Sequence, residues 1–147
     1  MTELISITYQ NIDLLKQFIE SMGDSNNTFK YFEKRSLDCI SNHLITYILL
    51  NSEIPVAYGH LDKDGNDIWL GVCVTEKSRG QGFGKIMMDK LLKYCKNNNI
   101  KKIKLSVYKQ NINAIKLYEN LGFINTNSKE NIIFMEKTFK LEGEQNV

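Results

Sequence analysis

The sequence predicts an α+β fold built on a mainly antiparallel sheet, and three features of the chain lead to that prediction. Its 147 residues suit a single domain spanning residues 1–147. Three β-rich apolar runs, at 44–50, 55–61 and 67–74, follow one another with only short turns between them, as in an antiparallel meander. The remaining segments alternate between helical and strand periodicity, which gives the element order β-α-(α)-β-β-β-α-β-α-β-β.

The part of the chain before the meander is predicted to hold one strand and one or two helices. Residues 4–9 alternate between apolar and polar side chains, which is typical of a half-buried strand. Residues 11–22 carry apolar side chains at helical spacing, and the polar run 23–27, which begins with glycine, ends that helix. Residues 28–42 are ambiguous, with Ser36 as a candidate cap for a short second helix.

Two tight turns are predicted to separate the three middle strands. The first covers residues 51–53 and the second covers 62–66, where Gly65 is free to adopt a positive φ. After the third of these strands the periodicity changes. Residues 82–97 are predicted to form a strong amphipathic helix, and residues 102–107 alternate as in a strand with one wet face.

The chain is predicted to end with a short helix and a hairpin. Apolar side chains share one side of a helix at 113–121, and Gly122 fits its C-terminal cap. Residues 123–125 and 131–137 are expected to pair as a closing hairpin. The tail at 141–147 is expected to fray.

Composition and charge argue against several classes of protein. The net charge of +2 is too small to favour nucleic acid or an anionic membrane as a partner. Three cysteines, Cys39, Cys73 and Cys95, make an odd count without C-x-x-C spacing, so neither a disulfide framework nor a metal site is expected, and a cytoplasmic location fits best. No signal peptide is expected, and no stretch approaches the roughly 18 apolar residues that a membrane span needs.

A glycine-rich turn stands between the predicted strand at 67–74 and the predicted helix at 82–97. The first N–H groups of a helix lack intrahelical partners and carry partial positive charge, so this turn is a candidate anion site. Its glycines let phosphate oxygens approach the backbone without a Cβ in the way. The spacing fits neither a Walker A loop nor the G-x-G-x-x-G dinucleotide fingerprint. The turn consists of Arg79, Gly80, Gln81, Gly82, Phe83 and Gly84, and Lys85 follows it.

This turn and a second segment together resemble the GNAT family of N-acetyltransferases. Residues 79–84 match the family's Q/R-x-x-G-x-G/A signature, and they stand where the family has it, between the fourth strand and the following helix. Residues 111–123 are similar to the family's N-x-x-A-x-x-L-Y-x-x-x-G-F segment. The resemblance is carried by residues 67–123, because the first 60 residues match only in the order of their elements.

The resemblance implies the GNAT fold, a mixed, mainly antiparallel central sheet of six or seven strands with about four helices on both faces. It also implies that acetyl-CoA lies between the fourth and fifth strands, which splay apart, and that the acetyl group passes directly to a primary amine in a ternary complex. The backbone of Val72 and Val74 would bond the pantetheine arm, and the Val74 N–H would stabilise negative charge on the thioester oxygen. The implied cofactor-binding residues are Val72, Cys73, Val74, Arg79, Gly80, Gln81, Gly82, Phe83, Gly84, Lys85, Asn111 and Tyr118.

The resemblance also suggests catalytic roles. Tyr118 is similar to the family's general acid, which protonates the leaving thiolate of coenzyme A; the alternative is an aromatic side chain that only packs on its helix. Asn111 is either a ligand contact or a helix cap, and Lys85 is either a cofactor contact or a solvated lysine. A base is also needed, because the acceptor ammonium must lose a proton, and the family supplies it from variable positions. The candidate bases are His60, Glu76 and Asp67.

The acceptor site is predicted beside an aromatic and basic segment at residues 28–35. Aromatic faces stack on sugars and arginine pairs with phosphate, so this segment favours a small anionic acceptor, such as an amino sugar carried on a nucleotide. The alternative is that its aromatic residues belong to the core and its charges are solvated. The predicted substrate-binding residues are Phe29, Tyr31, Phe32, Arg35 and Trp69.

The leading function is therefore acetyl transfer from acetyl-CoA to the amine of a small molecule. The second hypothesis is a protein N-terminal or lysine acetyltransferase, and the third is a non-catalytic acetyl-CoA-binding regulatory module. The presence of both the glycine turn and Tyr118 favours an enzyme, since a sensor needs only the turn. Many members of the family form homodimers, so the resemblance adds a homodimer to the partners to be considered.

Overall fold

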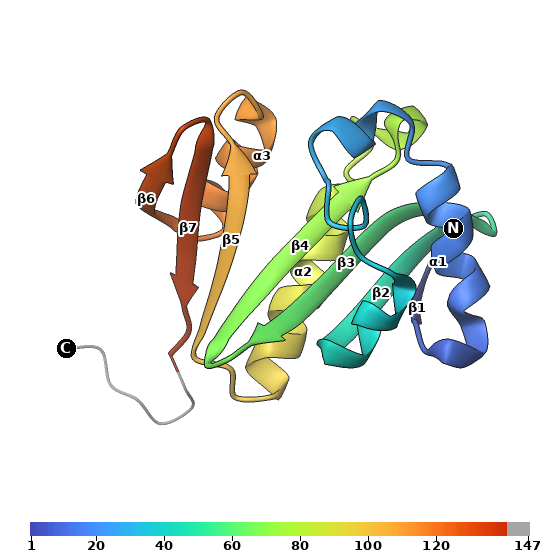
Figure 1. Ribbon diagram of the computed structural model, residues 1–147, viewed down its shortest axis with the longest axis horizontal. Coiled ribbons are helices and arrows are strands. Elements are labelled where there is room, and N and C mark those ends of the chain that lie inside the picture. Colours follow the sequence, from blue (N-terminus) through green and yellow to red (C-terminus); the bar gives the residue numbers. More distant parts are fainter. Residues whose placement is uncertain (141–147) are drawn as a thin grey trace.

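The computed structural model of the protein describes residues 1–140, and its centre is one seven-stranded sheet (Figure 1). The strand order is β1-β2-β3-β4-β5-β7-β6; the β4–β5 pair is parallel and the other neighbours are antiparallel. The strands are β1 Thr2–Ser6, β2 His43–Asn51, β3 Ile54–Asp64, β4 Asp67–Val74, β5 Lys102–Tyr108, β6 Ile124–Lys129 and β7 Ile132–Thr138. The α-helices are α1 Ile12–Glu20, α2 Phe83–Asn97 and α3 Ile112–Asn120, and the short 3₁₀ helices are η1 Tyr9–Asn11, η2 Gly23–Asn27, η3 Leu37–Asn42 and η4 Glu76–Ser78.

The mixed sheet with helices on both faces confirms the predicted fold class. The expected frayed tail at 141–147 lies outside the described residues. No helix among the residues described is long and apolar enough to cross a membrane.

The structure departs from the expected boundaries where capping or strand pairing decides them. The first strand ends at Ser6 rather than residue 9, because Thr8 and Asn11 form a reciprocal cap that starts η1: the Thr8 hydroxyl accepts from the Gln10 N–H, and the Asn11 side chain accepts from the Thr8 N–H at 2.7 Å. The turn expected at 62–66 is shorter, since β3 continues to Asp64 in register with β4.

The ambiguous segment at 28–42 contains the 3₁₀ helix η3 and no α-helix. Ser36 stands at the expected N-cap position, but its side chain makes no capping hydrogen bond there. The second helix of the predicted order is therefore 3₁₀ rather than α. The closing hairpin also forms as expected, except that β6 runs longer than residues 123–125.

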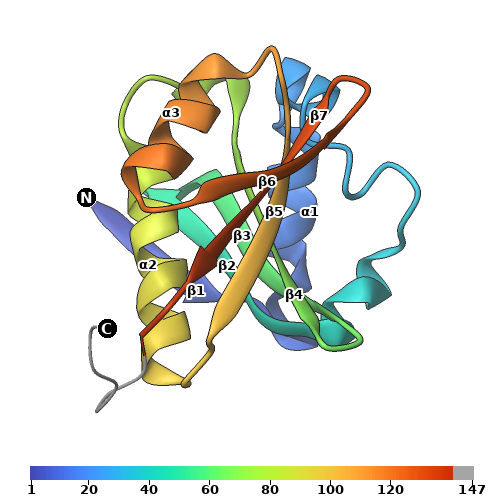
Figure 2. The ribbon, with the colours of Figure 1, turned by 90° about the vertical axis from the view of Figure 1, so that its left-hand side faces the viewer.

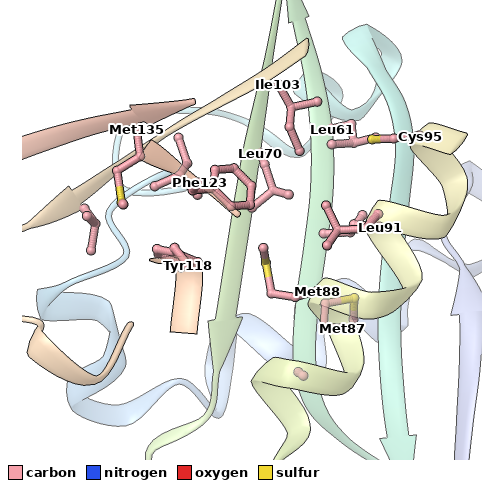
Figure 3. Packing of buried hydrophobic residues seen from close by; sticks show 14 of the residues in the cluster. Leu61, Leu70, Met87, Met88, Leu91, Cys95, Ile103, Tyr118, Phe123 and Met135 are labelled. Carbon is pink, nitrogen blue, oxygen red and sulfur yellow. The ribbon is translucent and has the colours of Figure 1, made fainter. Parts of the chain in front are cut away.

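Two hydrophobic cores lie on opposite faces of the sheet, as the strand periodicity requires. Figure 2 shows α2 and α3 on one side of the sheet and α1 on the other. The core under α2 and α3 contains Leu61, Leu70 and Leu91, which pack between the sheet and α2 in Figure 3. The core under α1 is centred on Phe18 and Tyr58. Strand β3 is buried on both faces, which explains why it reads as a continuous apolar run.

The feature that positions the site is the separation of β4 from β5. These strands pair at a single position, Trp69 with Lys104, and they diverge beyond it (Figure 1). Strand β5 then pairs along its whole length with β7. The backbone edge of β4 from Leu70 to Val74 is therefore left without a strand partner.

Candidate active site

A cavity of about 1100 Å³ lies where β4 and β5 separate. One end is formed by Arg79 and Gly84 of the glycine turn and by the start of α3, and the other end by the α1 face of β3 and β4 with the segment after η2. Of the predicted site residues, the cavity is lined by Phe29, Tyr31, Arg35, His60, Trp69, Val72, Cys73, Val74, Arg79, Gly84, Asn111 and Tyr118. The structure thus brings the two halves of the predicted site to one opening.

The unpaired edge of β4 presents alternate backbone groups to this cavity. The Thr75 N–H donates to the Val56 carbonyl on the β3 side. Because backbone groups alternate between the two edges of a strand, Val72 and Val74 face the opposite edge, toward β5. The carbonyl of Val74 accepts a hydrogen bond from the Ser25 hydroxyl at 2.6 Å, which confirms that orientation. These backbone groups fit an extended ligand arm that would take the place of a strand.

The glycine turn forms the N-terminus of α2, and its geometry fits an anion. Gly82 is the N-cap residue with φ of 86°, and Gly80 has φ of 77°. A Cβ added at either position would meet nothing within 4 Å, so the space next to the turn is open to a ligand. No side chain caps this helix, so its first N–H groups remain available.

The cationic side chains near the turn are engaged with carboxylates. The Arg79 guanidinium bonds the Asp24 carboxylate and donates to the Ser25 hydroxyl at 2.6 Å. The Lys85 ammonium lies 3.2 Å from the Asp89 carboxylate, one turn further along α2. An anion at the turn would therefore be held first by backbone N–H groups. Of the predicted cofactor-binding residues, those that do not line the cavity are Gly80, Gln81, Gly82, Phe83 and Lys85, and Phe83 is a buried core residue.

Tyr118 lines the cavity and is only 9% exposed. Burial raises the pKa of Tyr118 to about 12, and the nearby Cys73 adds to this rise. The phenol therefore keeps its proton at neutral pH, as a general acid must. It also packs 5.9 Å from the Phe123 ring, so the packing role is present as well. The Asn111 side chain accepts from the Ala114 N–H and caps α3 while it lines the cavity.

Cys73 carries a protonated thiol. Burial raises its pKa to about 12, against a smaller opposing effect of the Arg79 charge. A thiol attacks carbonyls as the thiolate, so this environment disfavours Cys73 as a nucleophile.

His60, the first candidate base, is buried with 3% of its surface exposed and lies opposite Gly71 across the β3–β4 pair. Its Nδ1 is 2.6 Å from the hydroxyl of Tyr58. Tyr58 is fully buried, and among the described residues its hydroxyl has no other partner, so it donates to Nδ1 and the ring proton is on Nε2. Burial lowers the pKa of His60 well below its usual value. The ring is therefore neutral and presents a donor, which does not suit direct proton abstraction.

The other two candidate bases lie outside the cavity lining. The Glu76 carboxylate accepts from the Asp24 N–H at 2.6 Å and braces η2 against η4. Asp67 begins β4, at the end away from the glycine turn, and its carboxylate is 3.3 Å from the Lys104 ammonium.

Tyr31 and Asp62 line the end of the cavity away from the glycine turn, and they belong to a hydrogen-bonded group with His43 that the sequence analysis missed. The Tyr31 hydroxyl donates to the Asp62 carboxylate at 2.8 Å and is 2.6 Å from Nε2 of His43. Since the Tyr31 proton goes to Asp62, His43 donates through Nε2, and its Nδ1 accepts from the Thr46 hydroxyl at 2.7 Å. Burial raises the pKa of Tyr31 and lowers that of His43 to about 4, so both side chains keep their neutral forms.

The predicted aromatic and basic segment divides between the cavity and the core. Phe29, Tyr31 and Arg35 reach the cavity, whereas Phe32 packs against Tyr58 with ring centroids 5.3 Å apart and is not part of the lining. The Arg35 guanidinium stacks 4.2 Å from the Tyr31 ring centre. Trp69 lines the opening from β4. Among residues 1–140, no three His, Cys, Asp or Glu side chains are grouped in a way that could hold a metal ion.

Comparison with known proteins gives one consistent result. The model of the family described as "Acetyltransferase (GNAT) family" matches residues 11–123. The chain is 29% identical over 108 residues to the uncharacterized N-acetyltransferase YobR of Bacillus subtilis, an alignment that covers 74% of this chain and 37% of that protein. It is 35% identical over 68 residues to the spermine/spermidine N(1)-acetyltransferase of Bacillus subtilis, covering 45% of this chain and 44% of that protein. The matches thus span less than half the length of these curated relatives.

Solved structures share the fold at low identity. The ribosomal-protein-S18-alanine N-acetyltransferase of Escherichia coli superposes with a TM-score of 0.75 at 17% identity, covering 100% of this chain and 99% of that one. A paia N-acetyltransferase of Thermoplasma acidophilum in complex with coenzyme A gives a TM-score of 0.72 at 15% identity, covering 95% and 99%. At these identities the likeness concerns the fold alone.

Proposed function

The chain belongs to the acetyltransferase (GNAT) family, and from that premise we propose that it transfers the acetyl group of acetyl-CoA to a primary amine of a small molecule, directly and within a ternary complex. The observation that carries the proposal is the unpaired edge of β4, which lines one cavity together with Tyr118 and with Arg79 and Gly84 of the glycine turn. This edge offers backbone donors at the centre of the opening, with an anion site at one end and a protonated phenol beside it.

Each group has one task in the proposed reaction. Acetyl-CoA, when bound, supplies an activated thioester. The N–H groups at the start of α2 bind its pyrophosphate, and the backbone of Val72 and Val74 orients the arm that leads to the sulfur. The Val74 N–H donates to the thioester carbonyl oxygen and stabilises the negative charge that develops there. Tyr118 donates its proton or a hydrogen bond to the leaving sulfur, a thiolate whose thiol has a pKa of about 8.5.

Two acceptor classes are supported by the far end of the cavity. The Tyr31 and Trp69 rings with the Arg35 guanidinium suit an amino sugar, including one carried on a nucleotide. The carboxylates of Asp62 and Asp64 line the same end and suit a polyamine, and one relative is named for spermine and spermidine acetylation. We prefer the amino sugar because the rings of Tyr31 and Trp69 at this end of the cavity can stack on a sugar.

The test is release of free thiol from acetyl-CoA in the presence of amino sugars, nucleotide-linked amino sugars, polyamines, amino acids and peptides. Turnover with one of the small amines supports the proposal. Turnover with peptides alone would assign a protein acetyltransferase. Binding of acetyl-CoA without turnover on any acceptor would indicate a non-catalytic acetyl-CoA-binding module.

Replacement of Tyr118 tests the acid role directly. Tyr118→Phe is expected to lower kcat about 10- to 100-fold, at or below the low end for acid–base catalysis because the leaving thiolate is a good leaving group, with little change in acetyl-CoA affinity. The matched control is Tyr94→Phe, which removes a hydroxyl that donates to the Leu44 carbonyl at 3.1 Å outside the cavity lining. Equal kcat in Tyr118→Phe and the wild type would remove Tyr118 from the mechanism.

A further inference from the structure

The end of β4 is held by a side chain from a distant segment rather than by a neighbouring strand on its open edge. Ser25, in η2, is only 2% exposed, and its hydroxyl donates to the Val74 carbonyl at 2.6 Å. Forty-nine residues separate the two in sequence. Strand β5 has already diverged at this position, so the Ser25 hydroxyl satisfies a carbonyl that would otherwise have no strand partner.

The same hydroxyl accepts a hydrogen bond from Arg79, the first residue of the glycine turn. The guanidinium lies 2.6 Å from the Ser25 oxygen and also bonds the Asp24 carboxylate. A serine hydroxyl has one proton and two lone pairs, so it donates to Val74 and accepts from Arg79 at the same time. A charged donor strengthens such a chain, because it polarises the hydroxyl toward the carbonyl.

Three further contacts fix Ser25 in place. The Glu76 carboxylate accepts from the Asp24 N–H at 2.6 Å, and the Glu76 N–H donates to the Met22 carbonyl at 3.1 Å. Gly23 permits this approach, since a Cβ on it would lie 2.8 Å from the Glu76 carboxylate oxygen. On the other side, the Phe29 N–H donates to the Ser25 carbonyl at 3.0 Å. Ser25 therefore connects β4, the glycine turn and Phe29 of the predicted acceptor segment 28–35.

We propose that Ser25 is a positioning residue for acetyl transfer: it ties the Val74 carbonyl to Arg79 and so holds the Val74 N–H in the direction that the thioester oxygen requires. The proposal rests on the proposed function above. Val74 ends its strand, and its carbonyl bond to Ser25 restricts rotation of the backbone there. A misdirected N–H weakens stabilisation of the developing negative charge without removing any group that binds coenzyme A.

Ser25→Ala is the first variant, with three readouts. Removal of an oxyanion donor costs on the order of 10²- to 10³-fold in kcat, and loss of its alignment should cost a part of that, about 10-fold. The Kd for acetyl-CoA should stay within about 2-fold. In amide NMR spectra, acetyl-CoA should shift the Val74 N–H signal more in the wild type than in Ser25→Ala. Ser25→Thr keeps the hydroxyl and should restore most of kcat.

The control is Ser21→Ala, which removes a comparable bond from a serine hydroxyl to a carbonyl, that of Gln17 at 2.9 Å, outside the cavity lining. If Ser25→Ala does not fold, Ser25→Cys takes its place as the test variant, because its thiol is similar in size to the hydroxyl and is a weaker hydrogen-bond donor. An unchanged kcat in folded Ser25→Ala or Ser25→Cys would overturn the proposal, and so would parallel losses of kcat and acetyl-CoA affinity. If the wild type acetylates no acceptor, the proposed function fails instead. Even then, an acetyl-CoA-induced shift of the Val74 N–H signal that is equal in the wild type and Ser25→Ala would reject the role of Ser25.

Discussion

Gly71 is the position where one added methyl group would disturb the acceptor side of the cavity most directly. A Cβ built on Gly71 would lie 2.7 Å from two ring atoms of His60 and 3.2 Å from the Phe29 ring. A Cβ carbon does not pack 2.7 Å from ring atoms, so the Gly71→Ala variant must displace His60. That ring is fixed by the Tyr58 hydroxyl at 2.6 Å and by the Tyr31 ring, whose centroid is 4.3 Å away.

The expected cost follows from overpacking a rigid site. Inserting an extra methyl group into a closed core costs about 1–3 kcal/mol. For a domain of this size each kcal/mol lowers Tm by about 3 °C, so Gly71→Ala should unfold roughly 3–9 °C below the wild type. Scanning calorimetry and urea unfolding measure both quantities.

Two comparisons separate this clash from a general effect of losing glycine. Gly84 lies in the first turn of α2, and the Cβ of Gly84→Ala would make an ordinary 3.6 Å contact with Val74 of β4, so this variant should be neutral or slightly stabilising. In a His60→Ala background, where the obstructing ring is gone, Gly71→Ala should cost less than about 0.5 kcal/mol. Full stability of Gly71→Ala, or the same loss with and without His60, would refute the reasoning.

Three further predictions concern Cys73, Gly82 and the half-buried His43. Since burial raises the pKa of Cys73 to about 12, iodoacetamide at pH 8 should leave Cys73 of the folded protein unmodified by mass spectrometry, and Cys73→Ala should keep its turnover; loss of all turnover would indicate a covalent route. Gly82→Val should abolish acetyl-CoA binding in calorimetry because its Cβ projects into the open space at the turn, whereas Gly65→Val, at a similar positive φ in the β3–β4 turn, should bind normally. Burial lowers the pKa of His43 from 6.5 to about 4, so the unfolded chain binds more protons between these values, and stability is complete above pH 6.5 and is lost as the pH falls toward 4. Urea unfolding should show a loss of about 2 kcal/mol from this residue between pH 7 and pH 5, absent in His43→Asn; an equal loss in the variant would contradict the assignment.

The elements on the glycine-turn side of the cavity could be predicted well, because the sequence patterns that specify them are local. Strand β4 covers the predicted residues 67–74, and α2 ends at the predicted Asn97. Both features follow from short-range patterns, alternation in the strand and a glycine turn before an amphipathic helix. The cap of α3 by Asn111 is equally local, since the side chain bonds an N–H three residues later.

The acceptor half could not be predicted in detail because distant residues determine its shape. The bond between Tyr31 and Asp62 joins residues 31 positions apart, and the brace from Glu76 to Asp24 joins residues 52 apart. Asp62 read as part of a polar turn, but pairing with β4 extends β3 through it and brings it to the cavity. Phe32 has the same composition signal as Phe29 and both rings pack on Tyr58, but only Phe29 also reaches the cavity.

The protonation states around β4 constrain how the acceptor must arrive. Tyr118 and Cys73 keep their protons, and His60 is neutral with its donor nitrogen available, so none of these three accepts a proton readily. The Asp24 carboxylate lining the cavity is paired with Arg79. The remaining lining carboxylates, Asp62 and Asp64, lie opposite Trp69 and Asp67, at least three residues or about 10 Å along β4 from Val72. The carboxylates of Asp62 and Asp64 can therefore bind an ammonium group at their end of the cavity. The ammonium must give its proton to water or to one of these carboxylates before the neutral amine attacks the thioester at β4. This requirement favours amines that are partly neutral at the working pH.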